Sequence, residues 1–176
     1  MGLKGGPTQD EVMAVSLAKL GIRPGDRVVD VGCGTGKVAV AISKTAERVY
    51  AIDRRSEAVA CARQKAAAAG AGNVEFFEGD AVEILPDLGP LDAAFVGGSG
   101  RLPEVLDLLA DAVRGRIVVN AVMVGTLHEA IASMQRLEIF VEAVHLQVSR
   151  SAGIAGGVMF KPINPVYIIV GGAGCS

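Results

Sequence analysis

The segment 28–36, which reads Val-Val-Asp-Val-Gly-Cys-Gly-Thr-Gly, limits the possible folds of this chain more than any other feature. Its valines, interrupted only by Asp30, predict a buried strand. Its alternate glycines predict a tight turn into a helix over Lys37–Thr45. A near-continuous apolar strand is typical of a parallel sheet that helices cover on both faces. The segment therefore predicts an α/β fold.

Helix and strand signals alternate along the rest of the chain. Predicted helices cover Val12–Leu20, Ser56–Ala69, Ala81–Leu85, Pro103–Val113 and Thr126–Leu137. Predicted strands cover Arg27–Gly32, Arg48–Asp53, Asn73–Glu78, Leu91–Val96, Arg116–Ala121, Ile139–Ser149 and Val166–Val170. Because no helix separates the last two strands, we expect a Rossmann-like, seven-stranded, mostly parallel sheet. It ends in an antiparallel β-hairpin and has helices on both faces.

We expect a single domain over residues 1–176, since no internal repeat or linker interrupts the pattern. Within it, residues 1–24 form an N-terminal helix or lid. Thr8 and Glu11 have the spacing of a capping box at its start. Residues 150–165 are predicted to form a long loop on the substrate side or at an interface, because long connections in compact domains are commonly functional.

Composition excludes several classes of function. The formal net charge is −2 and no basic stripe is visible, which argues against nucleic-acid binding. No apolar run reaches the roughly 18 residues of a membrane span, and the N-terminus has no apolar leader. The three cysteines lack the spacing of metal ligands. We therefore expect a cytoplasmic protein without a metal site.

The glycine turn and the next strand predict a nucleoside site. Gly32, Gly34 and Gly36 let the backbone approach a ligand closely, and Asp53 ends the second strand, where a carboxylate can accept hydrogen bonds from ribose hydroxyls. Asp53 can equally cap the helix that starts near Ser56. A dinucleotide fingerprint would have Gly or Ala at position 37, where this chain has lysine, and no phosphate-binding Walker loop is present.

Five further positions complete this predicted site. Asp30 lies near the carboxyl end of the first strand and can hold an ammonium group, directly or through water. Asp80 can accept from the exocyclic amine of adenine while the Ala81 N–H donates to a ring nitrogen, although Asp80 can also be only a helix N-cap. Cys33 is interpreted as a small buried turn residue that, like Thr35, offers backbone contacts.

Asp30, the glycine turn, Asp53 and Asp80-Ala81 together resemble the class I methyltransferases that use S-adenosyl-L-methionine. More particular segments resemble the precorrin-6 or cobalt-precorrin-6B carbon-15 methyltransferases of cobalamin (vitamin B12) biosynthesis. These segments are Gly-Gly-Pro-Thr at 5–8, Phe-Val-Gly-Gly-Ser-Gly at 95–100 and Asn-Pro-Val-Tyr at 164–167. The resemblance implies C-methylation of a tetrapyrrole with decarboxylation of an acetate side chain, a cofactor contact by Thr8, and a homotetramer. Whether the acceptor carries cobalt, and whether a partner precorrin methyltransferase shares the decarboxylation, stays open.

The acceptor is expected at the end of the fourth strand, where residues 97–100 (Gly97, Gly98, Ser99 and Gly100) form a glycine-rich floor that leaves room for a large flat molecule. Cations near this floor can bind its carboxylates, with Arg101, Arg150 and Lys161 as candidates, although each is equally explained as a surface charge. No residue is assigned as a catalytic acid or base. Competing hypotheses are another small-molecule or tRNA methyltransferase of this fold, a non-catalytic subunit with the same fold, and a nicotinamide oxidoreductase.

Overall fold

A computed structural model describes residues 8–98 and 100–172. The predictions on Gly5–Pro7, Ser99 and Cys175 therefore lie outside the described residues. No helix within the described ranges is both long and apolar enough to cross a membrane.

In chain order the elements are α1 (Asp10–Leu20), β1 (Arg27–Val31), α2 (Lys37–Ile42), β2 (Arg48–Asp53), α3 (Ser56–Ala68), β3 (Val74–Glu78), α4 (Ala81–Ile84), η1 (Leu85–Asp87), β4 (Ala93–Val96), α5 (Leu102–Ala112), β5 (Arg116–Ala121), α6 (Val124–Arg136), β6 (Phe140–Leu146), β7 (Ser149–Ile154), β8 (Gly157–Pro162) and β9 (Val166–Gly172).

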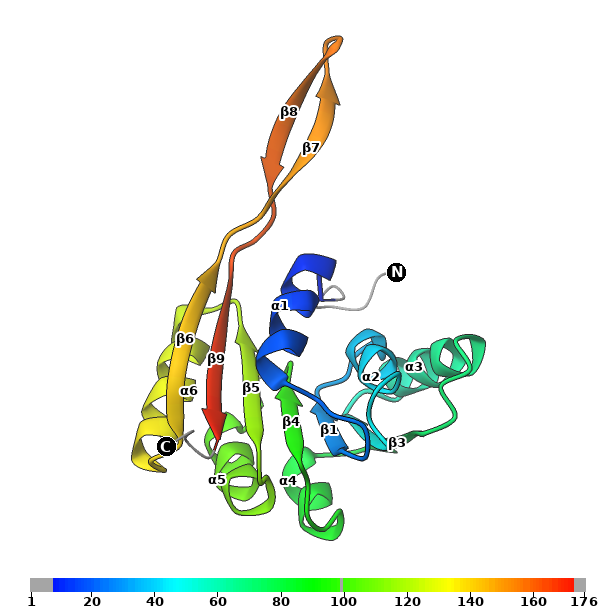
Figure 1. The fold of residues 1–176 in the computed structure, drawn as a ribbon, viewed down its shortest axis with the longest axis vertical. Helices are drawn as coiled ribbons and strands as arrows, with labels where there is room; N and C mark the ends of the chain where they lie inside the picture. The colour runs from blue at the N-terminus through cyan, green and yellow to red at the C-terminus, as the bar shows by residue number, and fades with distance from the viewer. Residues whose placement is uncertain (1–7, 99, 173–176) are drawn as a thin grey trace.

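The main sheet has seven strands in the order β3-β2-β1-β4-β5-β9-β6 (Figure 1). Strands β1 to β5 pair in parallel, whereas β9 runs antiparallel to both β5 and β6. The predicted mixed sheet with its antiparallel last strand is therefore confirmed. The order reverses direction at β1 and β4, which places a crevice between the carboxyl ends of these two strands.

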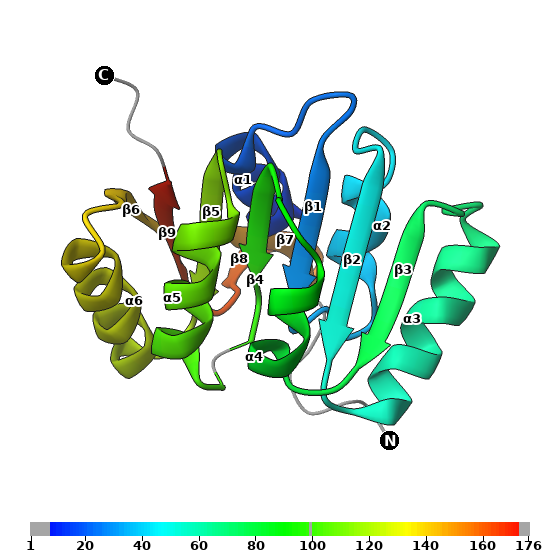
Figure 2. The same cartoon turned by 90° about the horizontal axis from the view of Figure 1, so that it is seen from below.

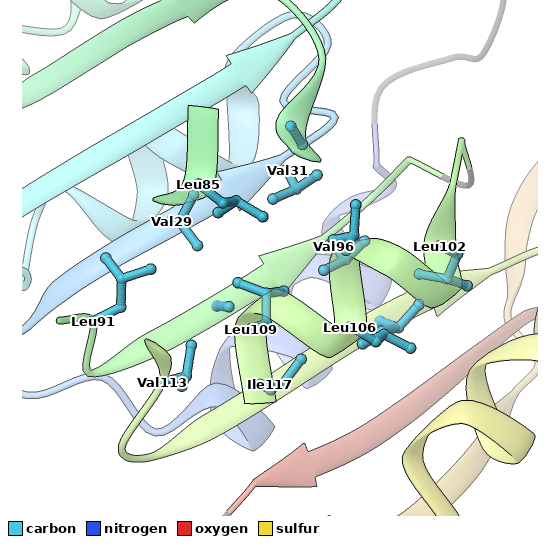
Figure 3. Close-up of a cluster of buried hydrophobic side chains, with 14 of the residues drawn as sticks. Val29, Val31, Leu85, Leu91, Val96, Leu102, Leu106, Leu109, Val113 and Ile117 are labelled. Atoms are coloured by element: carbon cyan, nitrogen blue, oxygen red, sulfur yellow. The ribbon is translucent and has the colours of Figure 1, made fainter. Parts of the chain in front are cut away.

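Helices cover both faces of the sheet, with α1 and α2 on one side and α5 and α6 on the other (Figure 2). Alternation along β1 divides its side chains between the two cores. Val28 joins the cluster under α1 and α2, whereas Val29 and Val31 join the cluster under α4, α5 and α6 (Figure 3). Asp30 lies between these two valines and is fully buried on the Val28 face.

The loop that the sequence predicts over residues 150–165 is absent, so this prediction is wrong. These residues contribute instead to an antiparallel hairpin, β7–β8, which extends far beyond the body of the molecule (Figure 1). We call residues 149–162 the arm. The sequence signal is weak, because three glycines at 153, 156 and 157 disfavour strands and no buried face imposes an alternation.

The predicted capping box at the start of α1 is also wrong. The helix begins at Asp10, and its N-cap is Gln9, which makes no side-chain cap. The Thr8 backbone carbonyl instead accepts a hydrogen bond from Lys37 Nζ at 2.6 Å, and Asp10 pairs with the same Nζ at 2.7 Å. The start of α1 is therefore joined to α2 by a long-range contact, which local sequence spacing could not reveal.

Candidate functional site

A cavity of about 360 Å³ opens at the carboxyl ends of β1 to β4. It lies where open α/β sheets bind ligands, beside the point at which the strand order reverses. The residues that line it are Thr8, Asp30, Val31, Gly32, Cys33, Gly34, Thr35, Lys37, Val38, Ile52, Asp53, Arg54, Arg55, Gly79, Asp80, Ala81, Phe95, Gly97, Gly98 and Gly100.

The three glycines of the turn have different structural roles. A Cβ on Gly32 would lie 2.6 Å from the backbone nitrogen of Gly98, and a Cβ on Gly36 would lie 2.8 Å from the Cβ of Ala62. These two glycines allow close packing. Gly34 has a φ of +54°, and its nearest neighbour, Arg55 Nη2, would lie 3.8 Å from an added Cβ. Because Gly34 lines the cavity, its missing side chain leaves space for a ligand.

Asp30 is a buried carboxyl group at the inner end of the site. Its side chain is completely buried, and among the described residues neither carboxylate oxygen has a partner in hydrogen-bonding geometry. Burial raises the pKa of Asp30 to about 7; the N–H of Ala39 partly offsets this rise, and the charge of Asp53 adds to it. The hydroxyl of Thr35 is likewise buried and has no partner within residues 8–98 and 100–172. Buried polar groups are normally satisfied, so both residues fit a polar ligand in this cavity.

Asp53 is held in place by four hydrogen bonds. The backbone N–H groups of Gly34 and Arg55 donate to it at 2.9 and 3.0 Å, and the Arg55 guanidinium donates through Nε and Nη2, both at 3.0 Å. Burial by itself would raise the pKa of Asp53, but these hydrogen bonds outweigh burial and lower it. Asp53 therefore stays ionised. It contacts the N-cap of α3, Arg55, but is not itself that cap.

Asp80 is confirmed as a helix N-cap, because its Oδ1 accepts from the Val82 N–H at 3.0 Å. Its other oxygen lies 3.7 Å from Nη1 of Arg101, whose Nε lies 3.5 Å from Oε1 of Glu104. Asp80 and Ala81 both line the cavity. Capping and ligand binding remain compatible, because only one carboxylate oxygen is used by the helix.

Most of the residues predicted for the cofactor gather around this cavity. Gly97 and Gly98 line it as well, whereas Gly36 packs against α3 instead. Arg101, Arg150 and Lys161 are not among the lining residues; Arg150 and Lys161 face each other across the arm, and Arg150 pairs with Glu11. Gly100 of the predicted floor lines the cavity too, whereas sequence reasoning misses Val31, Lys37, Val38, Ile52, Arg54, Arg55, Gly79 and Phe95.

The sequence does contain a signal for two of these missed residues, Arg54 and Arg55. Arg54 and Arg55 follow Asp53 directly, at the strand end where ligand residues are expected. Lys37 stands out in the sequence only because it breaks the dinucleotide fingerprint. In the structure it also joins the segment before α1 to the wall of the cavity, through Thr8 and Asp10.

A family model described as the precorrin methyltransferase domain matches residues 4–171. The chain belongs to this precorrin methyltransferase family. A relative from Methanosarcina acetivorans, named probable cobalt-precorrin-6B C(15)-methyltransferase (decarboxylating), is 46% identical and aligns over 97% of this chain and 96% of its own. A relative with the same name from Methanothermobacter thermautotrophicus is 37% identical over 95% and 89% of the two chains.

Solved structures agree with this placement in the precorrin methyltransferase family. A precorrin 8W decarboxylase from Methanobacterium thermoautotrophicum superposes with a TM-score of 0.92 at 37% identity, covering 96% of this chain and 92% of that one. A precorrin-6Y C5,15-methyltransferase from Geobacter metallireducens also superposes with a TM-score of 0.92, at 32% identity, covering 98% of this chain and 94% of that one. An S-adenosylmethionine-dependent O-methyltransferase from Thermotoga maritima is 17% identical, with a TM-score of 0.78. The match covers 98% of this chain and 69% of that one, and it shows the shared fold alone. The predicted class I methyltransferase fold is confirmed.

Proposed function

We propose that this chain uses S-adenosyl-L-methionine to methylate carbon 15 of cobalt-precorrin-6B, with loss of carbon dioxide from an acetate side chain, in cobalamin biosynthesis. The observation that carries the proposal is the fully buried Asp30 carboxylate in the cavity at the strand ends, which has no hydrogen-bond partner in the part of the chain that the structure describes. A cationic amino group is the ligand group that such a carboxylate favours. The names of the relatives support the acceptor and the reaction.

The cofactor site is proposed from the predicted residues. Asp30 binds the amino group, Asp53 the ribose hydroxyls, and Asp80 with the Ala81 N–H the adenine. The glycine turn supplies close backbone approach. The proposed set is Thr8, Asp30, Gly32, Cys33, Gly34, Thr35, Gly36, Asp53, Asp80 and Ala81.

The acceptor is proposed to lie against the glycine floor, with Arg101, Arg150 and Lys161 near its carboxylates. The exposed apolar run Val122–Val124 follows the carboxyl end of β5. Since β5 pairs in parallel with β4, this run lies on the same side of the sheet as the glycine floor. This run offers a surface for the apolar face of a flat ring. Ser99 belongs to the proposed floor by sequence.

When bound, S-adenosylmethionine supplies an electrophilic methyl group on its sulfonium. The residues of the chain orient the two reactants and exclude water, which accounts for much of the rate of such a transfer. No described residue is needed as a nucleophile. Loss of carbon dioxide breaks the bond to the carboxylate carbon and leaves the electron pair on the conjugated macrocycle. Uptake of one proton at the former acetate carbon then completes the step, and no protein acid is assigned to deliver that proton.

The direct test is turnover of the purified chain with S-adenosylmethionine and the cobalt-bearing or cobalt-free macrocycle. Mass spectrometry should show gain of a methyl group and loss of carbon dioxide. We expect the cobalt-bearing acceptor to be used. Binding of S-adenosylhomocysteine without turnover of either macrocycle would overturn the proposed acceptor. Methyl gain without loss of carbon dioxide would instead assign the decarboxylation to a partner precorrin methyltransferase.

We further propose that the chain works as a homotetramer in the cytoplasm and that the arm is part of its assembly surface. Ile154, Val158 and Phe160 are 53%, 73% and 69% exposed on a hairpin that projects from the body. Exposed apolar side chains gathered on one element are typical of protein interfaces.

Replacing Val158 and Phe160 together with aspartate is expected to convert the tetramer to smaller species, because two charges would have to be desolvated at the interface. Light scattering coupled to size exclusion measures the change. Val141→Asp is the matched control, since Val141 is 39% exposed on β6, outside the arm. An unchanged tetramer in the double variant would exclude the arm from the interface.

A further inference from the structure

The side chain of Arg54 reaches across the mouth of the cavity. Arg54 follows the last residue of β2, and a Cβ on Gly100, in the connection between β4 and α5, would lie 2.9 Å from the Arg54 Cζ. Strand β1 lies between β2 and β4 in the sheet. The guanidinium therefore passes over the end of β1, beside the glycine turn.

Arg54 differs from the other cations of the site in having no anionic partner among the described residues. Among the lining residues Lys37 pairs with Asp10 at 2.7 Å and Arg55 with Asp53 at 3.0 Å. Arg101, just beyond the lining, is shared between Asp80 and Glu104. Within residues 8–98 and 100–172, no hydrogen bond or ion pair involves Arg54. Its charge and its donors remain available to a ligand.

We propose that Arg54 binds a carboxylate of the acceptor and positions the ring over the glycine floor. This inference rests on the proposed function, because that function supplies an acceptor with acetate and propionate groups. A guanidinium presents paired donors that match a carboxylate. The carboxylate of the cofactor is a poorer match, since it is bonded to the carbon that carries the amino group. That amino group is assigned to the deeply buried Asp30, whereas Arg54 is exposed at the mouth.

The carboxylate at Arg54 is one that the acceptor retains. A guanidinium stabilises the ionised carboxylate, whereas decarboxylation must release it as neutral carbon dioxide while the electron pair stays on carbon. Pairing with Arg54 would slow that release. Arg54 therefore acts as a specificity residue at another acid group, so its loss should raise KM for the acceptor more than it lowers kcat.

The test uses protein saturated with S-adenosylhomocysteine and two probes, uroporphyrin III, which carries acetate and propionate groups, and its full methyl ester. We expect wild type to bind the acid and to bind the ester weakly. Arg54→Ala should weaken binding of the acid roughly tenfold or more, in keeping with the loss of a charged hydrogen-bonded pair. Arg54→Lys should recover part of the affinity. Arg48→Ala is the matched control, since Arg48 is exposed at the first position of β2, at the end opposite to Arg54, and pairs with Glu75.

Affinity for S-adenosylhomocysteine should stay within about twofold in all three variants, which also verifies the fold. Equal binding of the acid by wild type and Arg54→Ala would overturn the inference and leave the proposed function intact. Loss of cofactor affinity in Arg54→Ala would overturn it by assigning Arg54 to the cofactor carboxylate. Failure of wild type to bind the acid while it binds S-adenosylhomocysteine would contradict both the inference and the proposed acceptor class.

Discussion

Replacing Asp30 with asparagine is expected to stabilise the ligand-free protein and to remove its affinity for S-adenosylhomocysteine. Burial raises the pKa of Asp30 from 3.8 to about 7. A shift of this size costs the folded state on the order of 4 kcal/mol once the carboxyl is ionised. Asparagine removes the charge but leaves a buried amide without hydrogen-bond partners, which costs about 1–3 kcal/mol of stability. We therefore expect a net gain of about 2 kcal/mol in the free energy of unfolding.

This gain should depend on pH in a defined direction. Because the folded-state pKa is the higher one, the folded protein holds the proton more tightly than the unfolded chain between pH 3.8 and about 7. The stability of wild type relative to Asp30→Asn should fall as the pH rises through this window and stay constant above it. Cofactor binding should release a proton near pH 7, because an ammonium group keeps Asp30 ionised.

Urea unfolding of wild type and variant at several pH values measures the stability difference, and calorimetry in buffers of different ionisation enthalpy measures the proton release. Asp26→Asn serves as the control. Asp26 accepts an exposed hydrogen bond from the Arg23 N–H and is not among the residues that line the cavity. A variant Asp30→Asn that binds S-adenosylhomocysteine as wild type does would remove Asp30 from the cofactor site.

Replacing Gly34 with leucine is expected to abolish cofactor binding, lowering affinity for S-adenosylhomocysteine by at least roughly a hundredfold. Of the three turn glycines it has the most open space at the position that a side chain would take, and that space belongs to the cavity. A leucine there would occupy the volume that a ligand needs. Its left-handed φ of +54° adds a destabilisation of about 1–2 kcal/mol, which a folded domain of this size can tolerate.

Gly32→Ala gives the contrasting result. Its Cβ would lie 2.6 Å from the Gly98 backbone nitrogen, so two backbone segments would have to separate. We expect a loss of stability of several kcal/mol from this single methyl group. Calorimetric titration and urea unfolding of both variants separate binding from folding. If Gly34→Leu bound the cofactor normally, the cavity would not be the nucleoside site.

Much of the fold could be predicted because its patterns are local. Valine-rich strands such as Ile117–Val119 require burial on both faces, and strand–helix alternation requires parallel pairing. Asp53 and Asp80 could be placed together for the same reason, since the carboxyl ends of parallel strands meet at one edge. The arm escaped prediction because its strands are stabilised by pairing with each other, without an apolar face against the core.

The cations of the site were the least predictable part. Arg101 and Arg150 stand out in the sequence, yet each is paired with carboxylates that lie on other turns or other elements. Arg54 and Arg55 are adjacent in sequence but have different surroundings. Arg55 pairs with Asp53, whereas the Arg54 guanidinium lies beside Gly100. The sequence shows which residues are charged. Whether a charge has an oppositely charged partner depends on its distance to groups elsewhere in the chain.

The amino-acid order alone determined the strand and helix sequence, the glycine turn and the three carboxylates at strand ends, because hydrophobic periodicity and backbone freedom are properties of neighbouring residues. Only the tertiary structure decided which of these groups are satisfied. Asp30 has no hydrogen-bond partner among the described residues while Asp53 has four hydrogen bonds, and this difference comes from helix α2 and the Arg55 side chain packing around the same edge of the sheet. Burial and partner distance are set by packing between segments that are distant in the chain.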